Sequence, residues 1–496
     1  MNNHLMLGLV FFGLSSLFGL AIFVRGLGWP YKSYLATFSI VLIFLSAYFI
    51  INNSINIFSL IFMLSTLYSV INYLRLIKPK YVDDWLYNIT KQTFLALTYS
   101  QLLFLTLSYY NNFLSNYLNY LILFYLLVSL YLALYTTYRL KQTSVLSKAL
   151  LAEDELPTVT VAIAARNEDM DLHSCLDSVL IDTYPKLEVL VYDDESQDRT
   201  ADLIKQYAHD GVRFIKGGQI PEGWLAKNYA YQTLLNEASG EVVFFIGTDI
   251  RLHKNSIIQG ISLMLDRQSD MVAVMPIRTK NGALASIIQP MRYWWELAVP
   301  RIFPKRPPTL SSSWFARRDK LVSIGGFKSY KKSIIPEEHL AKRFNSSGKY
   351  IFARSNSQFF VSSHKNFYEQ WETLVRIRYP QVHRRPELVF FRNLFLISLL
   401  VPFLVVIPVV MTSPFSLLSI LALWVCALLL YTHIMVSWYT NHFSAIVAPL
   451  NFPIIILVDL VGINLSMYRY EFSQVIWKDR VVNNKLTAIA HLPKLD

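Results

Sequence analysis

Charged residues are scarce in this chain of 496 residues, because Asp, Glu, Lys and Arg make up only 16% of it. Average soluble domains carry about 25%. The shortage excludes a fully water-soluble protein and, together with 53% hydrophobic residues, a disordered one. The mean hydropathy is +0.34. Such a chain needs an environment that excludes water, and a membrane provides one.

Cysteines are few, and two kinds of recognition motif are missing. Cys175 and Cys426 are too few for a disulfide framework, which fits a reducing compartment. The loop GxxxxGK[ST] of phosphate-binding NTPases does not occur, so we do not expect an ATPase. The 46 Lys and Arg against 34 Asp and Glu give a net charge of +12, yet no basic run or nucleic-acid-reading motif accompanies it. The charge therefore predicts an anionic membrane face and anionic substrates, and no nucleic-acid partner.

Five apolar stretches precede residue 140, and each is close to the roughly 20 residues that cross a bilayer core. They are Leu5–Val24, Tyr34–Ile51, Ile55–Leu74, Thr93–Tyr110 and Leu118–Tyr138. The N-terminal MNNH lacks the positive charge of a signal peptide, so we interpret the first stretch as a span. Lys and Arg occur only in every second loop, which places the N-terminus outside and the residues after 140 in the cytoplasm. We therefore expect a multi-pass protein of the cell (plasma) membrane, with 1–140 as its first membrane region.

Three more apolar segments lie near the C-terminus. They are Leu388–Met411, Phe415–Val436 and Val447–Met467. Three full spans would leave the basic tail, residues 469–496, outside, against the same charge rule. We expect two or three membrane segments within residues 386–468, followed by a cytoplasmic tail. The third segment, which Pro449, Pro453 and Asp459 interrupt, is our candidate for a re-entrant or interfacial one.

Residues 158–385 have the composition of a water-soluble domain. Short runs rich in Val and Ile are typical of strands buried on both faces, and helical patterns such as MDLHSCLDSVL and RTADLIKQYA separate several of them. The runs are VTVAIAA at 159–165, EVLVYDD at 188–194, VRFIKG at 212–217, EVVFFIG at 241–247 and MVAVMPI at 271–277. The alternation predicts a mostly parallel sheet in an α/β domain, whose ligands bind at the carboxyl ends of the strands.

Polar side chains follow the predicted strands where such ligands bind. They are Arg166, Asn167 and Glu168 after the first strand, Asp193 and Asp194 after the second, Asp249 after the fourth, and Trp224 and Lys227 in the loop GGQIPEGWLAKNYA. Carboxylates near an Asn and a Lys suit a nucleotide diphosphate, because acids accept hydrogen bonds from ribose and base or hold a divalent ion, and Lys balances phosphate charge. Taken alone, Asp193 and Asp194 are also explained as helix caps, and Lys227 as a solvated helix lysine.

The motifs of this region follow one another in a distinctive order. They are VTVAIAARNE, EVLVYDDESQDRT, GWLAKNYA, GEVVFFIGTDI, SSSWFARRDKLVSIGGF and PEEHLAKR. The set resembles family 2 glycosyltransferases with the GT-A fold. The element GW-x-x-K-x-x-A, with WKDR at 477–480, resembles the membrane-bound subgroup that includes carotenoid- and hopanoid-pathway glycosyltransferases. The resemblance implies an α/β GT-A-like (Rossmann-like) cytoplasmic domain inserted between two α-helical transmembrane bundles.

The resemblance also implies roles for particular residues. Glu168 and Asp194, with Asp193 beside them, would bind the nucleotide of a nucleotide-diphosphate sugar. The D-x-D motif of the family holds Mg²⁺ or Mn²⁺, and here it reads GTD, with Gly247 in place of the first Asp and only Asp249 retained. A single carboxylate can still hold Mg²⁺, so the resemblance implies a divalent metal at a weakened site.

The general base of such inverting enzymes is an acid that precedes a helix. Aligning LAKR at 340–343 with that helix places Glu337 at the base position and Glu338 next to it. An inverting transfer needs a carboxylate that takes the proton of the acceptor hydroxyl. Acids in a first helical turn also simply complement the helix dipole, so both glutamates stay candidates.

Two segments mix aromatic, apolar and basic residues, as helices in the membrane interface do. They are SIIQPMRYWWELAVPRIF at 286–303 and NFYEQWETLVRIRY at 366–379. We expect Trp294, Trp295 and Trp371 to be interfacial anchors on the acceptor or membrane side. We place Gln381, His383, Arg384 and Arg385 on the same side. QVHRR at 381–385 is similar to the QxxRW motif of processive relatives, but Arg385 stands where Trp is expected, so we infer no polymer synthesis.

The leading hypothesis is an inverting glycosyltransferase that moves a sugar from a nucleotide-diphosphate sugar to a lipid or lipid-linked acceptor at the cytoplasmic membrane face. The alternative is a catalytically weakened membrane binding or assembly component, which Gly247 and the glutamate base both suggest. A transporter with a cytoplasmic domain is the least favoured hypothesis, because ionisable residues inside the spans are rare.

Overall fold

The computed structural model describes residues 118–144, 153–279, 292–300, 307–356, 359–440 and 442–482, with residue 285 and scattered positions before residue 47. The third and fourth predicted spans and the tail beyond residue 482 lie outside the described residues, and the first two spans are described only in part. The strands and helices that position the site lie within these ranges.

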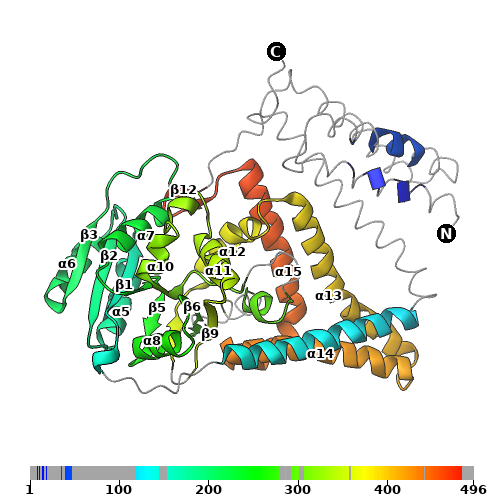
Figure 1. Cartoon of the computed structure of the whole chain (residues 1–496). Coiled ribbons are helices and arrows are strands. Elements are labelled where there is room, and N and C mark those ends of the chain that lie inside the picture. The colour runs from blue at the N-terminus through cyan, green and yellow to red at the C-terminus, as the bar shows by residue number, and fades with distance from the viewer. Residues whose placement is uncertain are drawn as a thin grey trace, which may run out of the picture.

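A seven-stranded sheet forms the centre of the soluble domain, in the order β3-β2-β1-β4-β8-β6-β9 (Figure 1). The strands are β1 (Val159–Ala165), β2 (Leu187–Asp193), β3 (Val212–Lys216), β4 (Val242–Ile246), β6 (Met271–Met275), β8 (Ser313–Arg317) and β9 (Tyr350–Arg354). Strands β1 to β4 pair in parallel, and β8 runs antiparallel between β4 and β6. The prediction of a mostly parallel α/β sheet is confirmed, although β8 and β9 were not among the predicted strands.

Helices cover both faces of the sheet, because alternate residues of each apolar strand point to opposite faces. Val161 and Ile163 of β1 pack in the layer formed by α5 (Asp169–Leu180), α6 (Thr200–Gln206) and α8 (Ser256–Asp266). Ala162, between them, packs in the layer formed by α7 (Ala226–Glu237), α10 (Arg318–Ser323) and α11 (Pro336–Ser346). The second layer continues into the apolar helices, so one core joins the domain to them.

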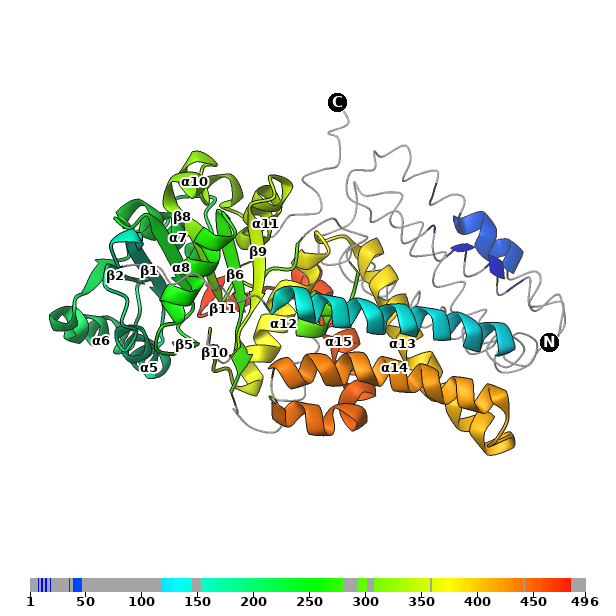
Figure 2. The same cartoon turned by 60° about the horizontal axis from the view of Figure 1, so that its bottom comes forward.

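Four helices of the described part are long and apolar enough to cross a membrane. They are Leu118–Thr143, α13 (Pro386–Thr412), α14 (Leu417–Thr440) and, within α15 (His442–Phe472), the stretch Ala448–Phe472. The first of them lies beside α14 and leads away from the sheet (Figures 1 and 2), and the hydroxyls of Thr137 and Tyr431 are 3.0 Å apart. The predicted apolar segments in these ranges are therefore all helical.

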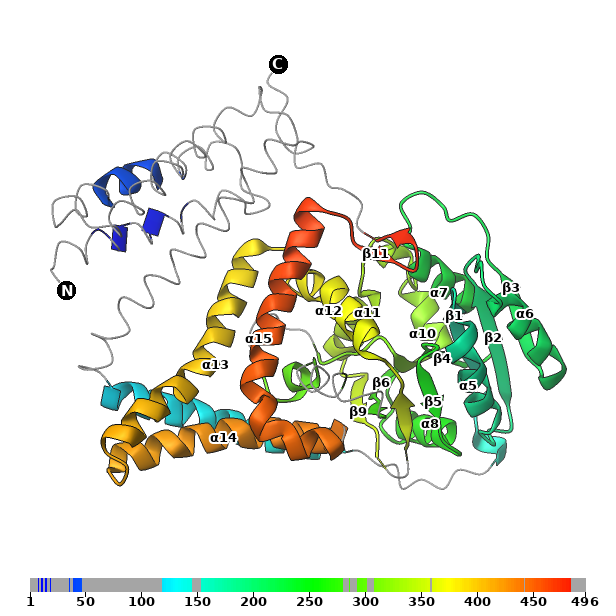
Figure 3. The same ribbon diagram turned by 180° about the vertical axis from the view of Figure 1, so that it is seen from behind.

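Helix α15 differs from the prediction for its segment. Pro449 and Pro453 lie inside one continuous helix. The prediction that they interrupt this segment is therefore wrong. Figure 3 shows that α15 begins beside α14, bends, and then runs across it between the sheet and α13. A bend is the usual effect of proline inside a helix. The position of α15 relative to a bilayer stays a prediction.

A buried charge network around Asp459 joins α15 to the soluble domain. Asp459 is 0% exposed, and its carboxylate lies 2.6 Å from Arg378 of α12 (Phe367–Gln381) and 3.5 Å from Arg392 of α13. Trp295 Nε1 donates a hydrogen bond of 2.8 Å to the same carboxylate. Removing one member of such a network leaves uncompensated charge in the interior.

The tryptophans that we expect at the membrane interface have other surroundings. Trp294 is fully buried and donates from Nε1 to Thr432 of α14 at 3.0 Å, so the interfacial position predicted for it is wrong. Trp371 is partly buried in a cluster around Leu374 and Val375, to which α15 contributes Val458 and Leu465. An aromatic and basic pattern reveals an amphipathic segment but not whether lipid or protein covers its apolar face.

We predict that Asp459→Ala lowers the stability of the fold by about 3–5 kcal/mol, because Arg378 and Arg392 lose their buried counter-charge. Thermal unfolding of the full chain in detergent measures the effect. Asp202→Ala is the matched control, because Asp202 is exposed on α6 and 3.3 Å from Lys205, where an ion pair contributes little. Equal melting temperatures for the two variants would contradict the structural role of the network.

Candidate active site

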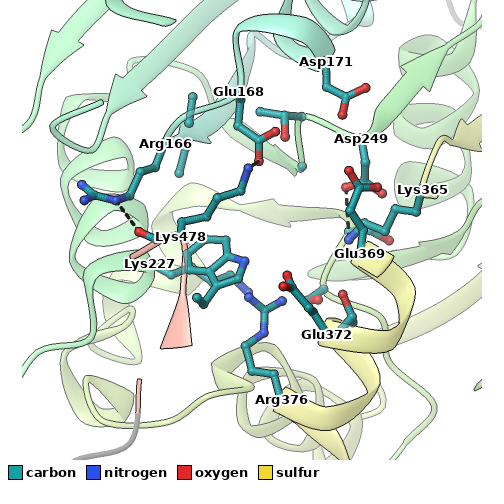
Figure 4. A pocket seen from close by; sticks show the side chains of 18 of the residues that line it. Arg166, Glu168, Asp171, Lys227, Asp249, Lys365, Glu369, Glu372, Arg376 and Lys478 are labelled. Atoms are coloured by element: carbon teal, nitrogen blue, oxygen red, sulfur yellow. Dashed lines mark hydrogen bonds and ion pairs between the residues drawn. The ribbon is translucent and has the colours of Figure 1, made fainter. Parts of the chain in front are cut away.

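A pocket of about 140 Å³ lies at the carboxyl ends of β1, β2 and β4 (Figure 4). Arg166 and Glu168 follow β1, Asp194 follows β2 and Asp249 follows β4, and all four line the pocket. Lys227, in the first turn of α7, lines it as well. Parallel strands present their carboxyl ends at one edge, which brings these distant positions together. Five of the residues predicted from the sequence therefore line one pocket, and their roles stay a prediction.

Helix α12 and a C-terminal hairpin form the opposite wall of the pocket. Helix α12 contributes Glu369, Glu372 and Arg376, and the hairpin of β11 (Ile476–Trp477) and β12 (Arg480–Val481) contributes Trp477 and Lys478. The guanidinium of Arg376 lies 4.7 Å from the centre of the Trp477 ring. The sequence missed these residues as site residues, although WKDR was noted as part of the resemblance.

The hairpin neutralises the acids at the β1 and β2 end of the pocket. Lys478 Nζ lies 3.2 Å from Glu168 Oε1, and Arg480 Nη1 lies 3.0 Å from Asp194 Oδ1. Arg166 Nε donates to the carbonyl of Lys478 at 2.8 Å. Burial raises the pKa of Asp194 to about 6, although Arg480 and Arg166 oppose this shift. Burial also raises the pKa of Glu168 against the charge of Lys478.

Three of the predicted residues lie near the pocket without lining it. The Asp193 carboxylate accepts from the Ser196 amide at 3.3 Å, which is a turn-closing role. Asn167 Oδ1 accepts from the Gln197 amide at 2.9 Å. Trp224 packs edge-on against Tyr229, with ring centres 5.8 Å apart. From the sequence, these residue types suit a ligand site as well as their neighbours do. Only the conformation of the turns decides which side chains line the pocket.

A buried ion pair joins Lys227 to one of the two candidate bases. Lys227 Nζ donates to Glu337, which follows Pro336 at the start of α11 and is only 1% exposed. Glu337 Oε2 has no hydrogen-bond partner among the described residues. Burial lowers the pKa of Lys227 below its ordinary value, and the Glu337 charge raises it in part. Glu337 therefore lies directly behind a cation of the pocket wall.

Glu338 points to a different place. It lines a second cavity together with His339, His383 and Arg384. Arg384 also stacks on the Tyr470 ring, 4.7 Å from its centre. Glu338 thus lines a cavity of its own, whereas Glu337 is buried behind Lys227, a distinction that their sequence position did not provide.

The remaining residues that we placed on the acceptor side do not line the first pocket either. Gln381 Oε1 accepts from Arg378 at 3.4 Å, and Arg385 pairs with Glu387. These contacts are local to the end of α12 and the start of α13.

Asp249 is enclosed by a hydroxyl and two cations. Ser363 Oγ donates to its carboxylate, Lys365 Nζ lies at 3.7 Å and Arg278 Nη1 at 4.0 Å. Burial alone raises the pKa of Asp249, but Lys365, Arg278 and the Ser363 hydrogen bond bring it below its ordinary value. Asp249 is therefore held as a carboxylate.

Residues 160–333 match the family model described as glycosyl transferase family 2. This segment is a family 2 glycosyltransferase domain. Three curated relatives share parts of it. Glycosyltransferase AglE of Haloferax volcanii is 28% identical over 182 residues, 35% of this chain and 57% of the relative. The 4,4'-diaponeurosporenoate glycosyltransferase of Staphylococcus haemolyticus is 27% identical over 113 residues, 22% of this chain and 29% of the relative.

The third relative is the UDP-Glc:alpha-D-GlcNAc-diphosphoundecaprenol beta-1,3-glucosyltransferase WfgD of Escherichia coli, 25% identical over 135 residues, 27% of this chain and 52% of the relative. The chain spans 29% to 57% of the length of these relatives. Among solved structures, the mannosyltransferase PcManGT of Pyrobaculum calidifontis, in complex with GDP-Man and Mn²⁺, is similar with a TM-score of 0.44 and 13% identity. That similarity covers 71% of this chain and 99% of the other.

The residues of the glycosyltransferase domain do not fit the divalent metal that the resemblance implies. A hard divalent cation needs several oxygen ligands around open space. Gly247 supplies none, and the Asp249 carboxylate already faces Ser363, Lys365 and Arg278. The described residues contain no group of three or more His, Cys, Asp or Glu side chains placed to hold a metal ion. We therefore derive no step through a metal.

We predict that Glu337→Gln lowers the pKa of Lys227, because the amide removes the negative charge that supports the buried ammonium ion. Acetic anhydride modifies only the uncharged amine, so the modification of Lys227, followed by mass spectrometry, shifts to lower pH. Glu338→Gln is the matched control and leaves the midpoint in place, since Glu338 lines the second cavity. If the pH midpoint of Lys227 modification in the Glu337→Gln variant equalled that of the wild type, the ion pair between Lys227 and Glu337 would be contradicted.

Proposed function

We propose that this chain is an inverting glycosyltransferase that transfers a sugar from a nucleotide-diphosphate sugar to a lipid or lipid-linked acceptor at the cytoplasmic face of a membrane. The observation that carries the proposal is the convergence of Glu168, Asp194, Lys227 and Asp249 on one pocket of a family 2 glycosyltransferase domain. Glu337 adds a buried carboxylate behind Lys227.

The donor binds by replacing the ion-pair partners that the charged side chains of the pocket have without a ligand. Asp194 and Glu168 accept hydrogen bonds from the base and ribose, and the cations that they now face turn to the phosphates. A diphosphate competes with Glu337 for Lys227, because both are anions and Lys227 is the cation between the pocket and Glu337. Donor binding therefore frees Glu337 at the moment when a base is needed.

The freed Glu337 acts as the general base. It takes the proton of the acceptor hydroxyl while the hydroxyl oxygen attacks the anomeric carbon and the diphosphate leaves with the electron pair of the broken bond. Lys227 stabilises the negative charge that grows on the leaving group. Glu338 takes no part in this step, because it lines the second cavity.

The acceptor comes from the membrane beside the pocket. Helix α12 lines the pocket on one side and packs on α15 on the other, where Ser466 Oγ accepts from the Tyr379 amide at 3.0 Å. The apolar helices next to it expose large hydrophobic side chains, as lipid-facing surfaces do. Examples are Phe124, Leu127, Leu134, Leu404, Ile407 and Met411. The name of the relative WfgD states a diphosphoundecaprenol acceptor, which supports a lipid-linked acceptor here.

The position of the hairpin restricts the membrane topology. Residues 476–481 contact the pocket, so they lie on the same side of the membrane as the glycosyltransferase domain. The chain between the glycosyltransferase domain and the hairpin contains α13, α14 and α15. It must therefore cross the membrane an even number of times. We infer that α13 and α14 cross and that α15, which runs across α14 in Figure 3, lies along the interface. The basic tail then stays cytoplasmic, as the charge rule requires.

The activity test uses the full chain in lipid nanodiscs with UDP- and GDP-sugars and membrane lipids, and measures release of the nucleoside diphosphate. We predict that Glu337→Gln lowers kcat by about 10²–10⁴-fold, because the base is lost. Donor affinity is expected to stay the same or rise, because the variant also removes the charge that competes with the diphosphate for Lys227. Glu338→Gln retains most of the rate. Failure of every donor to release diphosphate would refute the proposal.

A binding component without turnover is the second candidate, and the enclosure of Glu337 by Lys227 favours it. It predicts that donors bind but that no diphosphate is released with any acceptor lipid. The same experiment therefore separates the two functions.

The topology gives a further prediction. Ser413→Cys, between α13 and α14, reacts with a membrane-impermeant maleimide on intact cells, whereas Ser473→Cys, after α15, reacts only after permeabilisation. The wild-type background is low because Cys175 and Cys426 are both buried. Labelling of Ser473→Cys from outside would contradict the even number of crossings.

A further inference from the structure

Three cations surround the single carboxylate at the β4 end of the pocket. Arg278 ends β7 (Ile277–Arg278), Lys365 follows β10 (Val361–Ser363), and Arg292 lies in the helical turn at 292–297. All three line the pocket with Asp249. We call Arg278, Arg292 and Lys365 the cationic cluster. The Asp249 carboxylate lies 3.7 Å from Lys365 and 4.0 Å from Arg278, and Glu369 and Glu372 of α12 line the same pocket.

The cationic cluster also lines an adjoining recess that is free of acids. The recess is bounded by the cluster, by Arg378, and by the uncharged Gln370, Thr373, Leu374 and Ile377. Arg378 is already neutralised by Asp459. Glu296, on the same helical turn as Arg292, accepts a hydrogen bond from the Thr309 amide at 3.3 Å and does not line the recess. The recess therefore attracts an anion rather than a second metal ion.

Arg292 has unused hydrogen-bonding capacity. Its Nε is buried and has no hydrogen-bond partner among the described residues. Burial lowers the pKa of Arg292 to about 10, and the neighbouring Arg278 adds to this shift. Burying like charges together is costly unless an anion joins them. The arrangement is that of a site built for a negatively charged group.

Gly247 leaves room for the Asp249 carboxylate in the position where it faces cations. A Cβ atom at position 247 would lie 2.7 Å from Asp249 Oδ1. The missing first Asp of the motif therefore leaves the space into which the Asp249 carboxylate now reaches. There it accepts from Ser363 and lies 3.7 Å from Lys365. A divalent ion bound to Asp249 would meet the Lys365 ammonium and the Arg278 guanidinium at short range.

We propose that the cationic cluster takes the place of the divalent metal ion and binds the diphosphate of the donor directly. The inference rests on the proposed function and specifies its chemistry. As the bond from the anomeric carbon to the phosphate oxygen breaks, its electron pair stays on the diphosphate, and Arg278, Arg292 and Lys365 balance the new charge. The proton of the acceptor goes to Glu337. No metal ion is needed for charge or for atom balance.

The first test measures binding of UDP and GDP to the full chain in nanodiscs by calorimetry, with EDTA and then with Mn²⁺. We expect affinities that agree within about twofold. Binding that requires Mn²⁺ overturns the inference and leaves the proposed function standing. Binding of neither nucleotide, with or without Mn²⁺, overturns both.

The second test assigns the effect to the cluster. Lys365→Met is expected to weaken binding of the diphosphate by about tenfold or more, because a charged hydrogen bond is lost, and to weaken UMP or GMP much less. Lys205→Met on the exposed face of α6 is the matched control. Unchanged diphosphate affinity in a Lys365→Met protein that elutes and melts like the wild type overturns the inference.

A third measurement does not depend on a stable variant at Lys365. Electron paramagnetic resonance counts Mn²⁺ ions held by the wild-type chain in the presence of UDP or GDP, and we expect none at the site. One Mn²⁺ per chain overturns the inference. Gly247→Asp combined with Lys365→Ala restores two acids and removes the competing ammonium ion, and we expect it to bind Mn²⁺ and to need it for the nucleotide.

Discussion

The acids of the site are neutralised by cations from other parts of the chain, and the site depends on that constraint. Every acid that we assign to the donor pocket has a cationic partner from a distant part of the chain. Glu168 faces Lys478, Asp194 faces Arg480, Glu337 faces Lys227, and Asp249 faces Lys365. The acids of such a pocket are stable without a ligand, because each has a cation beside it at low dielectric. The pocket also favours a ligand that carries both anionic phosphates and hydrogen-bond donors, since each half of every pair finds a new partner.

The sequence predicts those acids of the ion pairs that lie at the ends of strands. Hydrophobic runs of strand length identify β1, β2 and β4, and the parallel pairing of these strands brings Glu168, Asp194 and Asp249 together. The position of a buried strand in the chain is a local property that a run of apolar residues reveals, and parallel strands present their carboxyl ends at one edge. The same reasoning cannot choose between Asp193 and Asp194, because adjacent residues differ only in the direction that the turn gives them.

The partner cations could not be predicted, because their positions depend on how separate elements pack. Lys478 lies 310 positions after Glu168 in the chain, and the WKDR motif that contains it does not indicate which acid it pairs with. Arg278, Arg292 and Lys365 stand at the ends of short elements whose position against β4 follows from tertiary packing. Amphipathicity at 366–379 correctly predicted a helix with one apolar face. It did not reveal that α15 covers that face and that the other face lines the pocket.

The close packing of α12 on α15 explains how a lipid substrate and a charged donor can meet. A Cβ atom at Gly462 of α15 would lie 2.0 Å from Leu374 Cδ2, so the glycine lets the two helices approach closely. Two residues after Leu374, and so on another face of α12, Arg376 lines the pocket, with its guanidinium 4.7 Å from the centre of the Trp477 ring. Arg378, on the α15 side, binds Asp459. Contacts of α12 with α15 hold this helix in place, and with it the charges that α12 presents to the pocket. In the function that we propose, the acceptor approaches the donor along α12.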